Sequence, residues 1–185
     1  VAWLDIDNQG ALERATSHLL DLGHKRIALL NGLPDRTFSH HRELGYRAAL
    51  AERDVPVDPA LIGNSVFTDE AAFRLAQAML ELRPRPTAFL AGSMMTALGI
   101  FRAIRQARLE LGKDVSMIAH DDVFPYLNAD NMSPTMSTTR SSMRLAGSRI
   151  AELIMQILDG KPPEEIHELW PVELVLRESS TRAPD

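Results

Sequence analysis

The stretch SMIAHDD, residues 116–122, is a short apolar run that ends on two adjacent carboxylates. A pair of carboxylates can exchange protons in catalysis, coordinate a metal ion, bind the hydroxyls of a small polar ligand, or cap a helix. The first three functions need partner residues from elsewhere in the chain. The choice between these four alternatives therefore depends on which residues follow the other strands of the sequence.

Catalytic and metal sites lack the spacing that their chemistry requires. A helical zinc site needs two histidines four residues apart, whereas His40 and His41 are adjacent and precede Glu43. His120 stands beside the two aspartates without a second histidine at ligand spacing. The sequence contains no Gly-rich phosphate loop, no G-x-S-x-G elbow and no G-x-G-x-x-G motif after a strand. We therefore expect no metal, no cofactor and no catalytic residue.

Apolar periodicity predicts strands that alternate with helices. Strands are expected at 1–7, 26–30, 62–67, 87–91, 115–120 and 136–140, helices after Asn8 and at 40–53, 70–82, 94–107 and 143–157, and an extended segment at 168–176. Strands that are apolar on both faces and alternate with helices are typical of a parallel sheet covered by helices on both sides. The expected fold class is therefore α/β.

Polar residues follow several of these strands. Ligands of open parallel sheets bind beyond the carboxyl ends of the strands, so these residues are the candidates for a site. They are Asp7 with Asn8, Asn31, Phe67, Ser93 and Asp121 with Asp122, together with Arg42 in the first turn of its predicted helix. Carboxylate, amide and guanidinium groups hydrogen-bond to hydroxyls, and an aromatic ring stacks on the apolar face of a sugar. The set suits a neutral polyhydroxylated or heterocyclic ligand.

Each candidate also has a structural alternative that spacing alone leaves open. Capping of the following helix is the favoured interpretation for Asp7 and an ordinary alternative for Ser93. Phe67 can belong to the hydrophobic core. The charged candidates can be surface groups, Arg42 in an ion pair and Asp121 in a solvated loop.

Composition limits the partners of this segment. Its 20 Lys and Arg residues against 25 Asp and Glu give a net charge of -5, without the basic block that binds nucleic acid. No apolar run approaches the length of a membrane span, which predicts a soluble segment without a membrane partner. The absence of cysteine excludes disulfides and fits a reducing compartment. Because the sequence begins at Val1, we expect a piece of a longer protein, and a missing signal peptide carries no information.

Seven ordered blocks stand out along the sequence: DN at 7–8, HLLDLGHKRIALLNG at 18–32, RELGYRAAL at 42–50, PTAFLAGSMMTALG at 86–99, VSMIAHDD at 115–122, SPTMSTTR at 133–140 and LVLRESST at 174–181. Together they resemble the effector-binding region of the lactose-repressor/galactose-repressor family of bacterial transcription regulators. The resemblance implies a type I periplasmic-binding-protein-like fold, in which three crossing strands join two lobes around an effector.

The same resemblance implies a division of the chain. One complete lobe, the C-terminal one, would span 7–134. Residues 1–6 and 137–170 would form crossing segments and part of the N-terminal lobe, and 171–185 a returning strand and tail. The crossings would lie near residues 6–7, 137–140 and 171.

Effector contacts follow from the resemblance position by position. The family's R-x-x-G-[FYW] block assigns a contact to Arg42, its G-[FY]-D-D block assigns one to Asp121, and its stacking aromatic corresponds to Phe67. The sequence departs from the family at Ser93, which with the next methionine replaces the usual N-D pair. The ligand specificity at this strand end is therefore left open. It departs again at His120, where an aromatic residue is common.

The resemblance implies a non-enzymatic cytoplasmic sensor: the part of a repressor that binds a small effector, expected to be a sugar. Operator DNA would be bound by a helix-turn-helix outside this segment. A homodimer is expected through 94–107, with Met94, Leu98 and Phe101 available, although these residues can equally face the sheet. A periplasmic sugar-binding protein of a transport system is the alternative with the same fold, and a small enzyme that uses Asp121 is a third class.

Overall fold

A six-stranded sheet forms the centre of the computed structural model, which describes residues 1–120 and 126–184. Its strand order is β3-β2-β4-β5-β6-β8. The strands are β2 (Ile27–Asn31), β3 (Ile62–Asn64), β4 (Ala88–Ala91), β5 (Ser116–His120), β6 (Ser137–Arg140) and β8 (Glu173–Val175). The first five are parallel, and β8 pairs antiparallel with β6 at the edge. The predicted α/β class with a mostly parallel sheet is confirmed.

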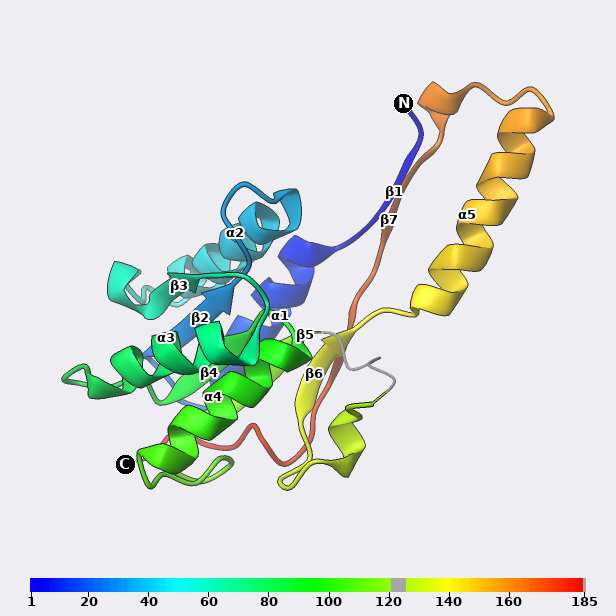
Figure 1. The fold of residues 1–185 in the computed structure, drawn as a ribbon. Coiled ribbons are helices and arrows are strands. Elements are labelled where there is room, and N and C mark those ends of the chain that lie inside the picture. The colour runs from blue at the N-terminus through cyan, green and yellow to red at the C-terminus, as the bar shows by residue number, and fades with distance from the viewer. Residues whose placement is uncertain (121–125, 185) are drawn as a thin grey trace.

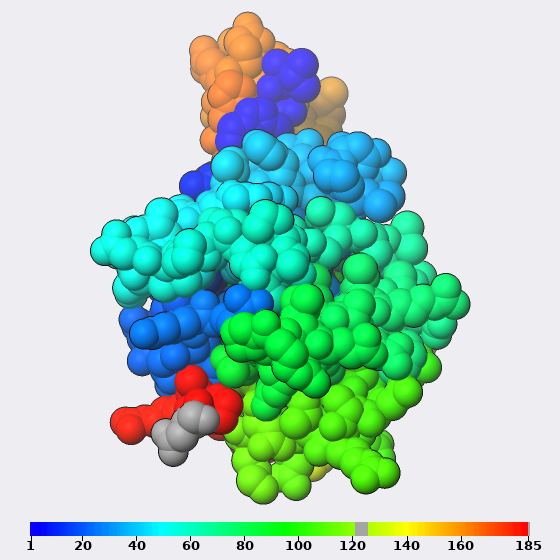
Figure 2. Space-filling view, turned by 90° about the vertical axis from the view of Figure 1, so that its left-hand side faces the viewer, coloured from blue at the N-terminus to red at the C-terminus, as the bar shows by residue number. Residues whose placement is uncertain are grey.

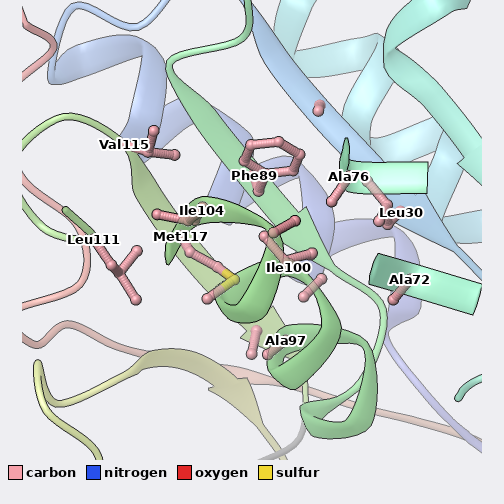
Figure 3. Packing of buried hydrophobic residues seen from close by; sticks show 14 of the residues in the cluster. Leu30, Ala72, Ala76, Phe89, Ala97, Ile100, Ile104, Leu111, Val115 and Met117 are labelled. Atoms are coloured by element: carbon pink, nitrogen blue, oxygen red, sulfur yellow. The ribbon is translucent and has the colours of Figure 1, made fainter. Parts of the chain in front are cut away.

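Helices cover both faces of this sheet. They are α1 (Asn8–Asp21) and α2 (Thr37–Glu52) on one face and α3 (Asp69–Glu81) and α4 (Met94–Gln106) on the other (Figure 1). Successive strand residues point to opposite faces, so Leu29 packs against α1 and α2 while Leu30 packs against α3 and α4. Figure 3 shows the second of these clusters, where Phe89 and Met117 lie beside Ile100 of α4.

A second, smaller unit rises from the main sheet (Figures 1 and 2). It contains the parallel pair β1 (Trp3–Ile6) and β7 (His167–Trp170), flanked by α5 (Met143–Leu158). Arg149 of α5 forms an ion pair with Glu168 of β7, with 2.6 Å between Nη2 and Oε1. Single turns of 3-10 helix at Pro59–Leu61, Ala129–Asn131 and Pro163–Glu165 complete the regular structure of the described residues.

Three boundaries differ from the sequence prediction. Helix α2 begins at Thr37, so Arg42 lies in its second turn rather than its first. Strand β3 ends at Asn64 because the chain turns into the cap of α3, where the Thr68 side chain accepts from the backbone of the first turn. The expected extended segment 168–176 is two strands in different sheets, broken at Pro171, which has no N–H for a ladder bond.

Glycines allow the helices on each face to approach closely. A Cβ atom on Gly99 of α4 would overlap the carbonyl oxygen of Asp69 and the Ala72 side chain of α3. Gly45 of α2 stands in the same relation to the carbonyl of Gln9 in α1. Since the nearest opposing atoms are the backbone carbonyl oxygens of Asp69 and Gln9, they cannot move aside as a flexible side chain would.

Gly99→Ala is therefore expected to lower the free energy of unfolding by about 1–3 kcal/mol through overpacking. The control is Gly147→Ala in α5, where no atom lies within 4 Å of the added Cβ. That change should be neutral or stabilise by about 0.5–1 kcal/mol, because alanine favours the helix over glycine. Urea unfolding of both variants measures the difference, and equal stabilities would contradict the close approach of α3 and α4.

Candidate functional site

The carboxyl ends of β2, β4 and β5 meet at one edge of the sheet, and Arg42 reaches this edge from α2. Only 5% of Arg42 is exposed. Its Nε donates to Oδ1 of Asn8 at 2.8 Å, and its Nη1 donates to the carbonyl oxygen of Gly92 at 2.9 Å. Its guanidinium also lies 4.9 Å from the centre of the Phe38 ring, within the range of a cation–π interaction. Arg42 therefore joins α1, α2 and the loop after β4.

Two aromatic rings border the same edge. The centres of the Phe38 and Phe67 rings are 5.9 Å apart, and the rings are tilted by 33°. The Phe67 ring lies so close to Gly32 and Gly92 that a Cβ atom on either glycine would fall within 3.0 Å of it. Phe67 is half-buried, so the two glycines hold it at the ends of β2 and β4 without removing it from solvent. Sequence reasoning missed Phe38, although it lies four residues before Arg42 and hence on the same face of α2.

Asn31 holds the loop after β2 in place. It is 1% exposed, its Nδ2 donates to the carbonyl oxygen of Ser39, and its Oδ1 accepts from the backbone N–H of Gly32. In this conformation both the nitrogen and the oxygen of the side-chain amide form hydrogen bonds within the protein. The hydroxyl of Ser39 is also buried and has no hydrogen-bond partner among the described residues.

Asp7 and Ser93 cap the helices that follow them. The carboxylate of Asp7 accepts from the backbone N–H of Gly10 at 2.8 Å and lies 3.5 Å from Arg14. The hydroxyl of Ser93 accepts from the backbone N–H of Thr96 at 3.1 Å. Both side chains are partly exposed, and the Ser93 hydroxyl oxygen also lies 3.0 Å from that of Thr96. The site prediction for Asp121 falls on a residue outside the described ranges.

His120 is the last residue of β5 and completes the edge between Arg42 and β6. It is 7% exposed, and its Nδ1 lies 2.9 Å from the hydroxyl oxygen of Thr139. Burial, with a smaller contribution from the positive charge of Arg42, lowers the pKa of His120 to about 3. The ring is therefore neutral at physiological pH.

This lowered pKa makes the stability of the protein depend on pH. The unfolded chain binds a proton at His120 below about pH 6.5 and the folded chain does not, so stability is complete above that pH and is lost as the pH falls. Between pH 7 and pH 5 the free energy of unfolding should fall by about 2 kcal/mol on account of this ring.

Urea unfolding at both pH values tests this, with His120→Asn as the reference that lacks the titrating group. The decrease should be about 2 kcal/mol larger in the wild type than in the variant. Equal decreases would show that His120 is protonated in the folded state.

The described residues contain no group of three or more His, Asp or Glu side chains that could hold a metal ion. Among them, no helix has both the length and the apolar character needed to cross a membrane. A groove of about 700 Å³ extends from Asp7 and Asn8 toward Trp3 and Leu169 of the smaller unit. Polar and aromatic groups thus gather at the carboxyl edge of a parallel sheet, which is where open α/β sheets bind small ligands.

Residues 16–180 match the family described as periplasmic binding protein-like domain. The HTH-type transcriptional regulator AglR of Rhizobium meliloti (strain 1021) is 49% identical over 185 residues, which cover 99% of this chain and 51% of AglR. CelR of Thermobifida fusca, another HTH-type transcriptional regulator, is 28% identical over 179 residues, which cover 97% of this chain and 52% of CelR. The chain thus spans about half the length of the curated relatives it matches.

Solved structures agree with these matches. A regulatory protein of the LacI family from Chloroflexus aggregans superposes with a TM-score of 0.90 at 30% identity, over 98% of this chain and 64% of that chain. The CelR–cellobiose complex gives a TM-score of 0.88 at 28% identity, over 97% of this chain and 54% of that chain. The chain belongs to the lactose-repressor/galactose-repressor (LacI/GalR) family, and the matched region is its periplasmic binding protein-like domain.

Proposed function

We propose that this chain is the effector-sensing part of a DNA-binding transcriptional repressor and that its effector is a neutral sugar. The observation that carries the proposal is the placement of Arg42, which is buried at the carboxyl edge of the sheet and held by Asn8 and Gly92. A guanidinium fixed in orientation at this edge is a group that recognises the oxygen atoms of polar ligands. The matched relatives are transcription regulators, which favours a sensor over a transport protein or an enzyme.

The chemistry of the edge supports a neutral sugar. Half-buried Phe67 and its neighbour Phe38 offer apolar rings, and the uncharged imidazole of His120 offers a hydrogen-bonding group. Asp7 and Ser93 are partly exposed, and their oxygen atoms can accept from hydroxyls. The CelR structure, which was solved with cellobiose, supports the sugar class by similarity.

The smaller unit supports a two-lobed arrangement. In our proposal 7–134 forms the C-terminal lobe, whose sheet is completed by β6 and β8, and β1, β7 and α5 are part of a second lobe. Helix α5 buries only Ala146 and Leu153 among its residues, while several of its apolar side chains stay exposed: Met143, Leu145, Ile150, Ile154, Met155 and Leu158. An apolar face of this size is expected to pack against the remainder of that lobe.

The connections between the units support a closure mechanism. The chain passes between them at Asp7, at residues 141–142 and at Pro171. An effector that binds one closure state more tightly shifts the equilibrium toward that state. Helix-turn-helix heads of a dimer would then change their spacing on an operator.

A thermal-shift screen of the full-length protein tests the effector class. Neutral monosaccharides and disaccharides, cellobiose among them, are compared with purine bases and nucleosides at equal concentrations. At a concentration 100 times its Kd, a bound sugar adds about 2.7 kcal/mol to the stability of the folded state and raises the Tm. A rise with a purine and with no sugar would contradict a sugar effector. The responding sugar should also change the protein's affinity for DNA carrying its operator.

We also propose a homodimer through α4. Leu98 and Phe101 are partly exposed on this helix, and Arg105 lies 5.9 Å from the centre of the Phe101 ring. Met94 does not belong to this surface, because it is 2% exposed and packs in the core between α4 and the sheet.

Phe101→Asp should raise the dimer dissociation constant of the full-length protein at least about tenfold, because it places a charge in a desolvated interface. Light scattering coupled to size-exclusion chromatography over a range of concentrations measures it. Lys25→Glu, in the loop before β2 and outside α4, is the control and should leave the dissociation constant unchanged. A dimer that persists equally in both variants would contradict this interface.

A further inference from the structure

His120 combines a central position with a free hydrogen-bonding atom. It ends β5, which lies between β4 and β6 in the middle of the sheet, and it is paired in register with Thr139 of β6. The ring is 7% exposed and lies at the carboxyl end of β5, on the edge of the sheet that Arg42 also reaches.

The two ring nitrogens have different surroundings. Nδ1 lies 2.9 Å from Oγ1 of Thr139, which is itself 2% exposed, so this contact fixes the orientation of the ring. Nε2 has no hydrogen-bond partner among residues 1–120 and 126–184. Within the described ranges, Nδ1 is thus the only ring nitrogen of His120 that is hydrogen-bonded to the protein.

We propose that His120 contacts the effector and reads one hydroxyl group of a neutral sugar through Nε2, with Thr139 as the positioning residue. This inference rests on the sugar-sensing function proposed above. It adds a specificity-determining group that is separate from Arg42 and from the two phenylalanines.

The Thr139 hydroxyl explains why a sugar hydroxyl suits this nitrogen. If Thr139 donates to Nδ1, the proton of the neutral ring is on Nε2, which then donates to the ligand. If Thr139 accepts from Nδ1–H, Nε2 accepts from the ligand. A hydroxyl can act in either sense, whereas a ligand that only donates or only accepts fits one tautomer alone. A ligand cation would meet the positive charge of Arg42 beside the ring.

Two substitutions distinguish the contributions of Nδ1 and Nε2 to ligand binding. Asparagine places its amide near the position of Nδ1, so His120→Asn keeps the contact with Thr139 and loses the group that faces the ligand. Glutamine places its amide near the position of Nε2, so His120→Gln keeps a hydrogen-bonding group for the ligand. His18→Asn, near the far end of α1 from the site, is the matched control.

Isothermal titration calorimetry of the full-length protein tests the assignment. The probes are cellobiose, maltose, trehalose and sucrose, followed by monodeoxy analogues of the sugar that binds most tightly. His120→Asn should weaken binding by about threefold to tenfold, the usual effect of one neutral hydrogen bond, while His120→Gln and His18→Asn stay within about twofold of wild type. One monodeoxy analogue should bind the wild type about threefold to tenfold more weakly than its parent sugar and bind His120→Asn as tightly as the parent does.

Two results would overturn the role of His120 without affecting the proposed sugar effector. One is that His120→Asn binds the sugar as tightly as wild type does. The other is that every monodeoxy analogue that binds the wild type more weakly than the parent sugar also binds His120→Asn more weakly than the parent sugar. Failure of all four sugars to bind the wild type would overturn the sugar effector and the His120 role together. If His120→Asn does not fold, the ¹⁵N chemical shift of Nε2 in the wild type replaces it. A change of this shift at saturating sugar supports the contact, and an unchanged shift rejects it.

Discussion

Arg42→Ala is expected to weaken effector binding by at least about 30-fold. Truncating one member of a buried, charge-assisted hydrogen-bond network costs about 2–5 kcal/mol. The Asn8 carboxamide and the Gly92 carbonyl would lose their partner at 2.8 and 2.9 Å, and the Phe38 ring would lose the cation beside it. Part of the effect is therefore loss of the ligand contact, and part is loss of order at the edge that surrounds the ligand.

Calorimetry with the sugar identified in the thermal-shift screen measures this loss. Arg47→Ala is the control, because Arg47 lies one turn further along α2 and forms an exposed ion pair with Glu43. Its affinity should stay within about twofold of wild type, as expected for a surface pair. Arg42→Lys should recover only part of the affinity, because a lysine cannot reproduce the planar fork of donors. Equal affinities of wild type and Arg42→Ala would remove Arg42 from the binding site.

His24→Ala should lower the free energy of unfolding by about 3–5 kcal/mol. His24 is 1% exposed and joins the start of the sheet to the C-terminal tail. Its Nε2 lies 2.9 Å from the carbonyl oxygen of Thr181, which can only accept, so Nε2 carries the proton. In the neutral ring Nδ1 then accepts from the Thr87 hydroxyl at 2.9 Å. Alanine would leave a cavity and several unpaired polar groups.

The loss should be accompanied by release of the tail. Hydrogen exchange at residues 179–183 should become faster in His24→Ala, while exchange in β2 and β4 remains slow. His40→Ala is the control, since His40 is exposed on α2, and its stability should stay within about 0.5 kcal/mol of wild type. An unchanged rate at 179–183 would show that the tail is held without His24.

The fold was largely predictable because its strands and helices carry strong periodic patterns. Strands such as 87–91 are buried on both faces and read as continuous apolar runs, and the helices show stripes at spacings of three and four. The errors lie at ends and connections. Helix α2 starts early although the side chain of Arg36, its N-cap residue, makes no capping hydrogen bond, so no sequence signal marked the start. The split of 168–176 depends on which sheet each half joins.

Parts of the site were also predictable. The rule that ligands bind at the carboxyl ends of parallel strands selected Arg42 and Phe67, which the structure places around the same Gly92. The same rule selected Asn31 without indicating that both ends of its amide are bonded to the protein. It could not single out Phe38 or Thr139, because their relevance comes from contacts across the chain. The contact of His120 with Thr139 was equally unpredictable, because the two residues meet only when β5 pairs with β6.

By itself, the sequence determined the α/β class, the family and the strand ends where a site could form, since these depend on local periodicity and on ordered blocks of residues. Tertiary structure alone decided which strand-end groups face one another, that Met94 is core, and that His24 anchors the tail. Those properties arise from pairs of residues that are far apart in the chain, such as His24 and Thr181 or Arg42 and Gly92. Their energies depend on burial and on bond geometry, which exist only once the sheet has formed.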